Sequence, residues 1–478
     1  MQTLPFRRFK FLKKSILAVL LCLSSCKEEV SKVPEPVGEF EQNVQPIFNR
    51  HCVECHSSRN AVRRLSLESW ESLLMGSENG AMVIPFHPKF SHLFQHLHTD
   101  TTLSPVAPPL MPIGRNPLSR EDVMAIYNWI QNGARNRNGK VPFEESYAKI
   151  YVTNQAADLV AVIDKRTGLL MRYVDVSAPG GISQNPLQSP HYVTVSNNKK
   201  YWYVSLIAKG EVWKFDAETD TLVAKVSVGS SPAHIVCSPD DSTLYVSNFS
   251  ASANRITIID ATTMTVKRTS PPINTAPHGL ALSRNGRWLY ATAYESDRIV
   301  ELDLETFSTR QFPLRRIGEP STRNYRPYQV MLSPDEKKLF VTCNGDAAFD
   351  GDLRIIDLET LDVKSVPVGK YPILMDYTPD KSRLYIANRN SNSVSVVNVQ
   401  SETVAATIEN VGVQPHGLAV SSDGFVYVSN ESLIGFVGHH PTDGGLRAGT
   451  SSIIDSRTNQ VVKVVEMLSF PAGVAIRE

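Results

Sequence analysis

An aromatic residue followed by small and β-branched residues recurs seven times in the last two-thirds of this 478-residue chain. The repeats lie 42 to 52 residues apart and are centred on Tyr151, Tyr203, Tyr245, Tyr290, Phe340, Tyr385 and Tyr427. A period of this length, filled with short strands, is typical of the four-stranded blades of a β-propeller. We therefore predict a multidomain protein in which residues 150–478 form an all-β seven-bladed propeller.

The repeat also predicts how the ring closes. An inner strand of the form P-H-G-L-A-V-S precedes each aromatic strand except the first, and the missing strand stands at residues 470–477 (FPAGVAIR). We expect this last strand to complete the first blade, because an incomplete ring would expose unpaired strand edges. The segment resembles the YVTN family of propellers, whose name is spelled by residues 151–154. This resemblance implies the fold and leaves the activity open.

Residues 1–25 have the features of an export signal. Basic residues precede an apolar run at 15–23, which is shorter than the roughly 20 residues needed to cross a bilayer. The tetrapeptide Leu-Ser-Ser-Cys that ends at Cys26 resembles a bacterial lipobox, with an ordinary signal peptide as the alternative. The resemblance implies a Cys26 lipid anchor, a tether at 26–40, and a cell-envelope protein on a membrane surface, facing the periplasm or on the outer membrane.

Residues 50–56 read RHCVECH, the spacing of a c-type haem attachment site. Two thiols three residues apart on a helical turn can add to the two haem vinyl groups, and the adjoining imidazole can then reach the iron. A thioredoxin-like pair would need a βαβ context, and a zinc site would need a second nearby ligand pair. We therefore predict one covalent haem c, attached at Cys52 and Cys55, with His56 as the proximal ligand.

The surrounding residues 41–135 are predicted to form a small all-α cytochrome c domain, since apolar residues at helical spacing precede the motif and end the segment. The segment resembles the single-haem cytochromes named after planctomycetes. The matching pieces are VQPIFNRHCVECH, an LMP step at residues 110–112, and LSREDVMAIYNWIQNGA. In that family the methionine of the step is the distal iron ligand, which implies this role for Met111.

Other distal arrangements remain open. A histidine in place of Met111 would give bis-histidine iron with a lower potential, and an open position would let the haem bind a small molecule. The alternative is that these side chains only occupy the surface of a polar stretch. The candidates in this stretch are Met82, His87, His92, His96 and His98.

Residues 136–149 are predicted to be a linker, long enough to place the haem domain against either face of the propeller. On one of these faces, four ring-bearing side chains begin inner strands at equivalent positions, namely His191, His278, Tyr328 and His416. Such a ring at the propeller mouth could bind a metal or a second cofactor, or carry protons. The alternative is that the imidazoles only hydrogen-bond to backbone.

Charge and architecture together order the possible functions. The formal net charge is +1, and the positive excess lies in the export signal, so no field for binding nucleic acid is expected. We expect an envelope cytochrome that exchanges electrons with a protein or small molecule, with the propeller as a docking or recognition platform. The alternatives are a periplasmic haem-dependent oxidoreductase that binds substrate, metal or a second cofactor at the mouth, and a non-enzymatic binding or sensing protein.

Overall fold

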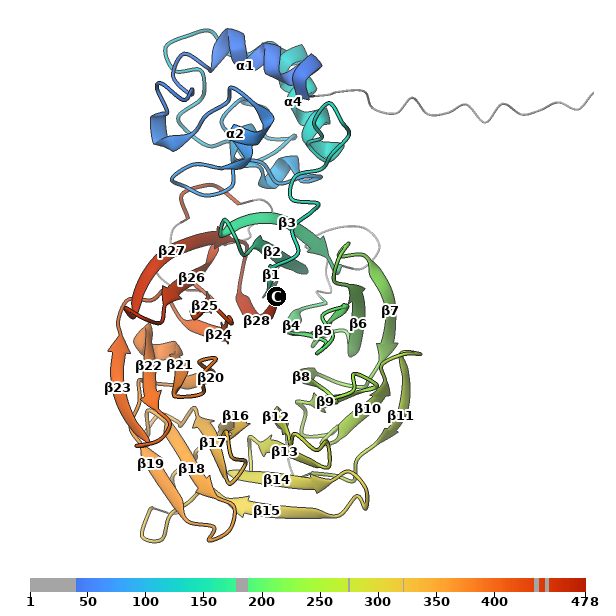
Figure 1. Ribbon diagram of the computed structural model, residues 1–478, viewed down its shortest axis with the longest axis vertical. Coiled ribbons are helices and arrows are strands. Elements are labelled where there is room, and N and C mark those ends of the chain that lie inside the picture. Colours follow the sequence, from blue (N-terminus) through green and yellow to red (C-terminus); the bar gives the residue numbers. More distant parts are fainter. Residues whose placement is uncertain (1–39, 178–187, 274–275, 321, 434–437, 443–446) are drawn as a thin grey trace, which may run out of the picture.

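The computed structural model describes residues 40–177, 188–273, 276–320, 322–433, 438–442 and 447–478 (Figure 1). The predicted export signal, the tether and Cys26 lie outside the described residues. Within the described ranges, no helix is long and apolar enough to span a membrane.

The N-terminal part is small and helical. Helix α4 begins after Ser119, whose hydroxyl accepts a hydrogen bond from the backbone amide of Asp122. The chain leaves the helix through Gly133, whose φ of 99° favours glycine. Phe48, Trp129 and other apolar side chains form the core of this helical region. The helices are η1 (Phe40–Val44), α1 (Gln45–His51), η2 (Val62–Arg64), α2 (Trp70–Leu74), η3 (Pro88–Phe90), α3 (His92–Gln95) and α4 (Arg120–Gln131).

The rest of the chain forms seven four-stranded antiparallel sheets around a common axis, which confirms the predicted seven-bladed propeller (Figure 1). Six blades use consecutive strands, and η4 (Arg389–Ser391) lies between two strands of one of them. These blades are β4 (Pro190–Val195), β5 (Tyr201–Leu206), β6 (Glu211–Asp216), β7 (Leu222–Ser227); β8 (Pro232–Cys237), β9 (Thr243–Asn248), β10 (Ile256–Asp260), β11 (Thr265–Thr269); β12 (Pro277–Leu282), β13 (Trp288–Ala293), β14 (Arg298–Asp303), β15 (Thr309–Pro313); β16 (Pro327–Leu332), β17 (Lys338–Cys343), β18 (Asp352–Asp357), β19 (Val363–Val366); β20 (Pro372–Tyr377), β21 (Arg383–Asn388), β22 (Ser393–Asn398), β23 (Thr403–Ile408); and β24 (Pro415–Val420), β25 (Phe425–Asn430), β26 (Gly449–Asp455), β27 (Gln460–Met467).

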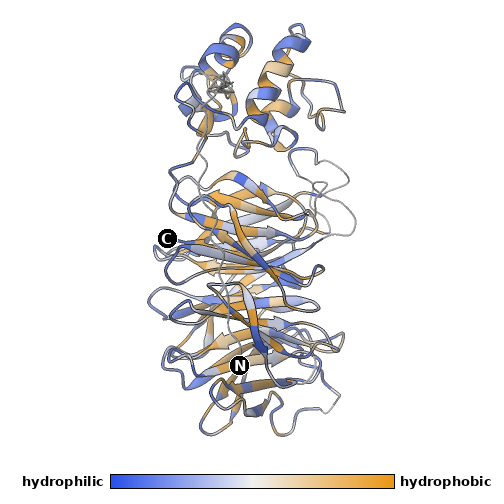
Figure 2. Cartoon of the chain, turned by 90° about the vertical axis from the view of Figure 1, so that its right-hand side faces the viewer, coloured by the Kyte–Doolittle hydropathy of each residue, from blue (hydrophilic) through white to orange (hydrophobic). Residues whose placement is uncertain are grey.

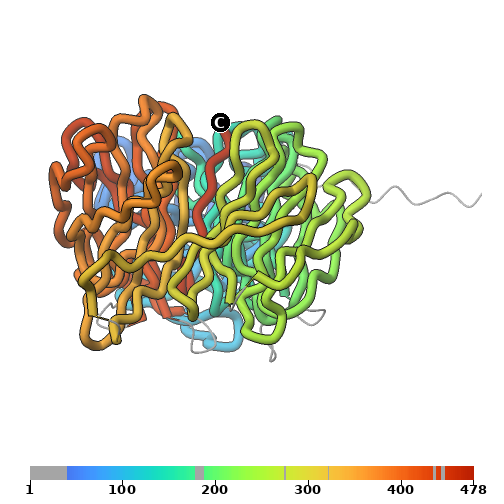
Figure 3. Tube along the Cα trace, turned by 90° about the horizontal axis from the view of Figure 1, so that it is seen from below, coloured from blue at the N-terminus to red at the C-terminus, as the bar shows by residue number. Residues whose placement is uncertain are grey.

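The remaining blade contains both ends of the propeller segment. Its strands, in order from the axis outward, are β28 (Pro471–Arg477), β1 (Lys149–Asn154), β2 (Leu159–Asp164) and β3 (Leu169–Asp175). The C-terminal strand therefore completes the first blade as the sequence predicts, and no blade lacks its inner strand. Figure 3 shows the disc from its edge, with the C-terminal segment between blades of early and late sequence.

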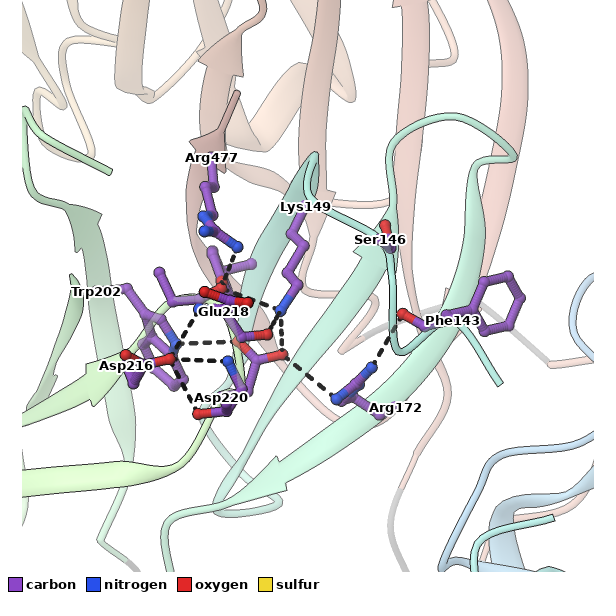
Figure 4. A network of polar contacts seen from close by, with 12 residues as sticks. Phe143, Ser146, Lys149, Arg172, Trp202, Asp216, Glu218, Asp220 and Arg477 are labelled. Atoms are coloured by element: carbon purple, nitrogen blue, oxygen red, sulfur yellow. Dashed lines mark hydrogen bonds and ion pairs between the residues drawn. The ribbon is translucent and has the colours of Figure 1, made fainter. Parts of the chain in front are cut away.

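A buried polar network fastens this first blade to the second (Figure 4). Lys149 lies at the start of β1, and its Nζ donates to Asp220 and to the carbonyl oxygens of Ala217 and Glu218 in the turn between β6 and β7. Arg477, near the end of β28, donates to the same Ala217 carbonyl. The two chain segments that close the ring are thus bound to one turn of the neighbouring blade.

The helical region lies at the outer edge of the disc, beside β3 and β27, and covers neither face (Figures 1 and 2). Ile84 and Phe90 belong to the same buried apolar cluster as strands of the first and last blades. The Phe90 ring packs edge-on against Tyr173 of β3, with centroids 5.4 Å apart. The length of the linker would allow the haem domain to lie against either face of the propeller. Burial of apolar side chains instead holds it at the outer edge of the disc.

Candidate haem and propeller-mouth sites

The CxxCH motif forms a tight turn at the end of α1. The amide of Cys52 still bonds to the carbonyl of Phe48, and the amides of Cys55 and His56 both bond to the carbonyl of Cys52. This turn holds two free thiols and an imidazole on one short segment. Burial raises the pKa of the Cys52 thiol to about 11, which argues against a thiolate-based redox pair of the thioredoxin kind.

A cavity of about 630 Å³ lies beside this turn. Cys52 and His56 line one part of it, Met111 lines another, and much of the remaining wall is apolar, including Leu65 and Leu93. This volume is in the range of sites that hold cofactors. Burial lowers the pKa of the His56 imidazole, and the backbone of Val62 and Leu65 opposes this, so the ring is held neutral beside the cavity. The residues present therefore fit a haem, with thiols for its vinyl groups and an imidazole and a thioether for its iron.

The structure separates the distal candidates. Met111, Met82 and His96 line the cavity, whereas His87, His92 and His98 do not. The backbone amide of Met111 donates a hydrogen bond to the backbone carbonyl of His96, which holds these two candidate ligands next to each other. The Nδ1 atom of His96 is 3.1 Å from the carbonyl oxygen of Pro109, which leaves its Nε2 as the free nitrogen.

The other histidines of this stretch are not a solvated surface. The ring of His87 packs against Phe90 and Tyr173, in the contact with the propeller. His98 is buried, and its Nε2 lies 2.7 Å from the hydroxyl of Ser104. The expectation of surface histidines on a polar stretch is therefore wrong for both residues, because the adjoining propeller and the local core cover them.

At the propeller mouth, the structure brings the four equivalent side chains together. His191 and His278 approach with their Nε2 atoms 3.3 Å apart, and the Tyr328 hydroxyl lies 3.3 Å from Nε2 of His416. Each residue is the second of its inner strand, where the pairing register shifts. Such bulges re-aim side chains, here toward the axis. All four side chains are buried.

Neighbouring acceptors fix the orientation of the three imidazoles. The Nδ1 atom of His278 lies 3.0 Å from the backbone carbonyl oxygen of Tyr328, and Nδ1 of His191 lies 3.0 Å from Oε1 of Gln155. Nδ1 of His416 lies 2.7 Å from the carboxylate of Glu431. With each Nδ1 engaged as a donor, the Nε2 lone pairs of His191 and His278 face one another, and that of His416 faces the Tyr328 hydroxyl. This is the arrangement in which metal-bound histidines are commonly held.

Sequence reasoning missed Glu431, Gln155 and Arg389. Arg389 donates through Nε and Nη2 to the Glu431 carboxylate, and its side chain is 23% exposed. All three share one repeat position: each directly follows the second strand of its blade, four residues after the repeat aromatic Tyr151, Tyr385 or Tyr427. This shared position on the mouth side of the repeat is the signal that could have found them.

Burial keeps the imidazoles of His191, His234 and His278 neutral. Burial and, to a lesser degree, the neighbouring His416 lower the pKa of His191 to about 3. Burial likewise lowers the pKa values of His234 and His278 well below the ordinary range, and it raises that of the Tyr328 phenol. Across the described ranges, however, no three His, Cys, Asp or Glu side chains are grouped so that they could hold a metal ion.

The fold and the haem-type motif define the class: a small c-type cytochrome domain joined to a seven-bladed propeller. Comparison with protein families identifies the family that each domain matches. Residues 52–109 match the family model of planctomycete cytochrome C, and residues 180–279 match that of the lactonase-type seven-bladed β-propeller. The chain thus combines a planctomycete-type cytochrome domain with a propeller of this class, as the sequence motifs predicted.

Curated relatives match part of the chain. Antigen Lp49 of Leptospira interrogans is 25% identical over 269 residues, which are 50% of this chain and 54% of that protein. The uncharacterised protein YncE of Salmonella typhi is 21% identical over 199 residues, 41% of this chain and 54% of that protein. The chain therefore spans about half the length of the curated relatives it matches.

Among solved structures, a functionally unknown protein from Desulfotomaculum acetoxidans has a TM-score of 0.54 at 14% identity, covering 69% of this chain and 98% of that one. This likeness shows the fold alone. Hydrazine synthase of Kuenenia stuttgartiensis has a TM-score of 0.47 at 18% identity, covering 58% of this chain and 80% of that one.

Proposed function

We propose that the protein is an extracytoplasmic electron-transfer cytochrome with one covalent haem c. One observation carries the proposal: the cavity of about 630 Å³ is bounded by Cys52 and His56 on one segment and by Met111 on another. When bound, a haem supplies reversible one-electron chemistry between its ferric and ferrous states. The propeller is proposed to serve as the docking or recognition platform for a redox partner.

The chain's own residues would hold and shield that haem. Cys52 and Cys55 would fix its position covalently, with His56 as the proximal iron ligand and Met111 as the distal one. Leu65, Leu93 and their apolar neighbours would exclude water, which disfavours the more charged ferric state and so raises the potential.

The test is expression with the c-type haem maturation machinery, followed by mass and spectral analysis. We expect the intact chain to gain the mass of one haem that survives denaturation, and the reduced protein to have a c-type spectrum. Cys52→Ala with Cys55→Ala should abolish the attachment, whereas Cys237→Ala in the propeller should leave it intact. A chain that acquires no covalent haem under these conditions would refute the proposal.

Export and lipidation belong to the same proposal, since haem c is attached outside the cytoplasm. Cys26 is proposed to carry the lipid that holds the protein on a membrane surface. Growth with a labelled fatty acid should label the protein and place it in the membrane fraction. Cys26→Ala should lose the label and release the protein, and an unlabelled wild-type protein would contradict the anchor.

A second candidate function is an oxidoreductase with a metal ion at the mouth. The observation that favours it is the 3.3 Å separation of the Nε2 atoms of His191 and His278. Two nitrogens that bind one tetrahedral ion at about 2.0–2.1 Å stand roughly 3.3 Å apart. Metal analysis should find a stoichiometric ion that His278→Gln removes while His439→Gln retains it. A metal-free wild-type protein after addition of zinc or copper would exclude this candidate.

A further inference from the structure

The propeller reaches into the wall of the candidate haem cavity. His439 and His440 line it together with Cys52, His56 and Met111 of the helical domain. The two histidines belong to the loop between β25 and β26 in the last blade, more than 300 residues further along the chain. The cavity is therefore closed jointly by both domains, although each domain matches a family of its own.

Contacts on both sides fasten this loop segment in place. The ring of His440 packs edge-on against His92 of α3, with centroids 3.5 Å apart, and lies 5.5 Å from the ring of His96. Gln95 donates to the carbonyl of Pro441 at 3.2 Å. On the propeller side, Nδ1 of His439 is 3.0 Å from the Glu466 carboxylate of β27.

His440 has a polar atom that the protein does not satisfy. Its side chain is 7% exposed, and its Nδ1 is buried without a hydrogen-bond partner. Burial, with smaller effects from His96 and His439, lowers its pKa to about 4, so the ring is neutral and carries one N–H. Buried polar atoms are rarely left unpaired in native proteins, and an exception points to a ligand that the protein atoms do not include.

A haem would provide the missing acceptor. Its two carboxylates project from the edge of the macrocycle away from the vinyl groups that bind cysteine. We propose that His440 donates a hydrogen bond from Nδ1 to a haem carboxylate, so that the propeller completes the haem pocket. This inference rests on the proposed haem attachment at Cys52 and Cys55. It makes the two domains one redox unit, in which a propeller loop sets the haem potential.

The direction of that effect follows from charge. A donor on the carboxylate withdraws part of its negative charge from the neighbourhood of the iron. Without the donor, the carboxylate stabilises the more positive ferric state. Replacement of His440 by a residue that keeps the ring and lacks the N–H should therefore lower the midpoint potential.

The test is a spectroelectrochemical titration of the full-length, haem-loaded protein. At the wild-type midpoint, we expect His440→Phe to decrease the ratio of reduced to oxidised haem by roughly threefold or more, because a hydrogen bond to a charged group is lost. His440→Gln restores an N–H donor and should recover part of the shift. The matched control is His87→Phe, at a histidine of the domain contact that does not line the cavity.

Three outcomes would overturn the inference. The first is a His440→Phe protein that carries a full complement of haem and has the wild-type potential. The second is an equal shift in His87→Phe, which would assign the effect to domain contact in general. The third is a stoichiometric metal ion in the wild type that His440→Phe removes without a change in potential. A wild-type protein with no haem would instead refute the proposed function. If His440→Phe does not load haem, the midpoint potential of His440→Gln is compared with that of the wild type to decide whether His440 sets the potential.

Discussion

Lys149 and Asp220 form a buried ion pair, with Nζ and Oδ2 2.8 Å apart and side chains 1% and 2% exposed. The pair connects the start of β1 to a turn of the second blade (Figure 4). Burial lowers the pKa of Lys149, and the attraction of Asp220 opposes this. The Asp220 carboxylate also accepts from the Tyr151 hydroxyl and the Trp202 indole, so its charge is held by several donors.

Lys149→Met should destabilise the propeller by about 3 kcal/mol, because it removes the nearer cation from a buried carboxylate and leaves only Arg172, at 3.8 Å. Urea unfolding followed by tryptophan fluorescence measures this. Lys149→Met combined with Asp220→Leu should be less destabilised than the single variant, since no buried carboxylate remains and Arg172 is partly exposed to solvent. The control Lys364→Met removes an exposed ion pair with Glu402 and should cost less than about 1 kcal/mol. Equal losses from Lys149→Met and Lys364→Met would show that the buried pair has no special role.

Met111→Ala should remove the distal iron ligand. We expect the ferric protein to lose the methionine-to-iron charge-transfer band and the ferrous protein to bind carbon monoxide. Met111→His should restore a six-coordinate spectrum at a lower potential, because imidazole favours ferric iron more than a thioether does. His96→Phe is the discriminating comparison, since His96 also lines the cavity. A spectrum that changes in His96→Phe and not in Met111→Ala would assign the distal position to His96.

The sequence allowed the propeller to be predicted blade by blade, because each repeat carries its own strand pattern. The closing strand at the C-terminus followed from the one inner strand missing at residue 150. The mouth residues were also predictable as a set, since His191 and His416 occupy the same position in equivalent strands. The place of a residue within its repeat can be read directly from a single sequence.

The position of the helical domain and its partners could not be predicted in this way. Phe90 and Tyr173 meet because each covers apolar surface of the other, and no spacing in the sequence relates them. His440 lies in the long loop between β25 and β26, and its contact with His92 depends on where the whole domain docks. The docking of one domain on another depends on the shapes of the two surfaces, and these produce no repeating pattern in the sequence.

The buried mouth histidines should make the propeller sensitive to mild acid. His191 has a folded pKa of about 3, whereas an unfolded histidine titrates near about 6.5. Between these values the unfolded chain binds a proton that the folded chain does not, so stability falls as the pH is lowered. Each such histidine contributes a slope of about 1.4 kcal/mol per pH unit. Urea unfolding from pH 7 to pH 4 should show a smaller slope for His191→Gln than for the wild type.

Val462→Thr is the control for this measurement, because this residue is 54% exposed and does not titrate, and it should keep the wild-type slope. If His191→Gln also has the wild-type slope, His191 takes up its proton equally in both states. That result would contradict the burial that the structure assigns to it.

Glu431 should give the opposite kind of test at lower pH. Burial alone would raise its pKa, but hydrogen bonds from His416 and Arg389 outweigh burial and hold the pKa of Glu431 below its usual value. A carboxylate with a depressed folded pKa stabilises the protein above its unfolded value of about 4.3, and this stabilisation is lost as the pH falls through the folded value. Glu431→Gln should therefore be less stable than the wild type by about 1–3 kcal/mol at pH 7, with the difference shrinking below about pH 4. Glu305→Gln, at an exposed turn, should match the wild type at both pH values. A Glu431→Gln deficit that stays constant down to acid pH would mean that the carboxylate's charge does not stabilise the mouth.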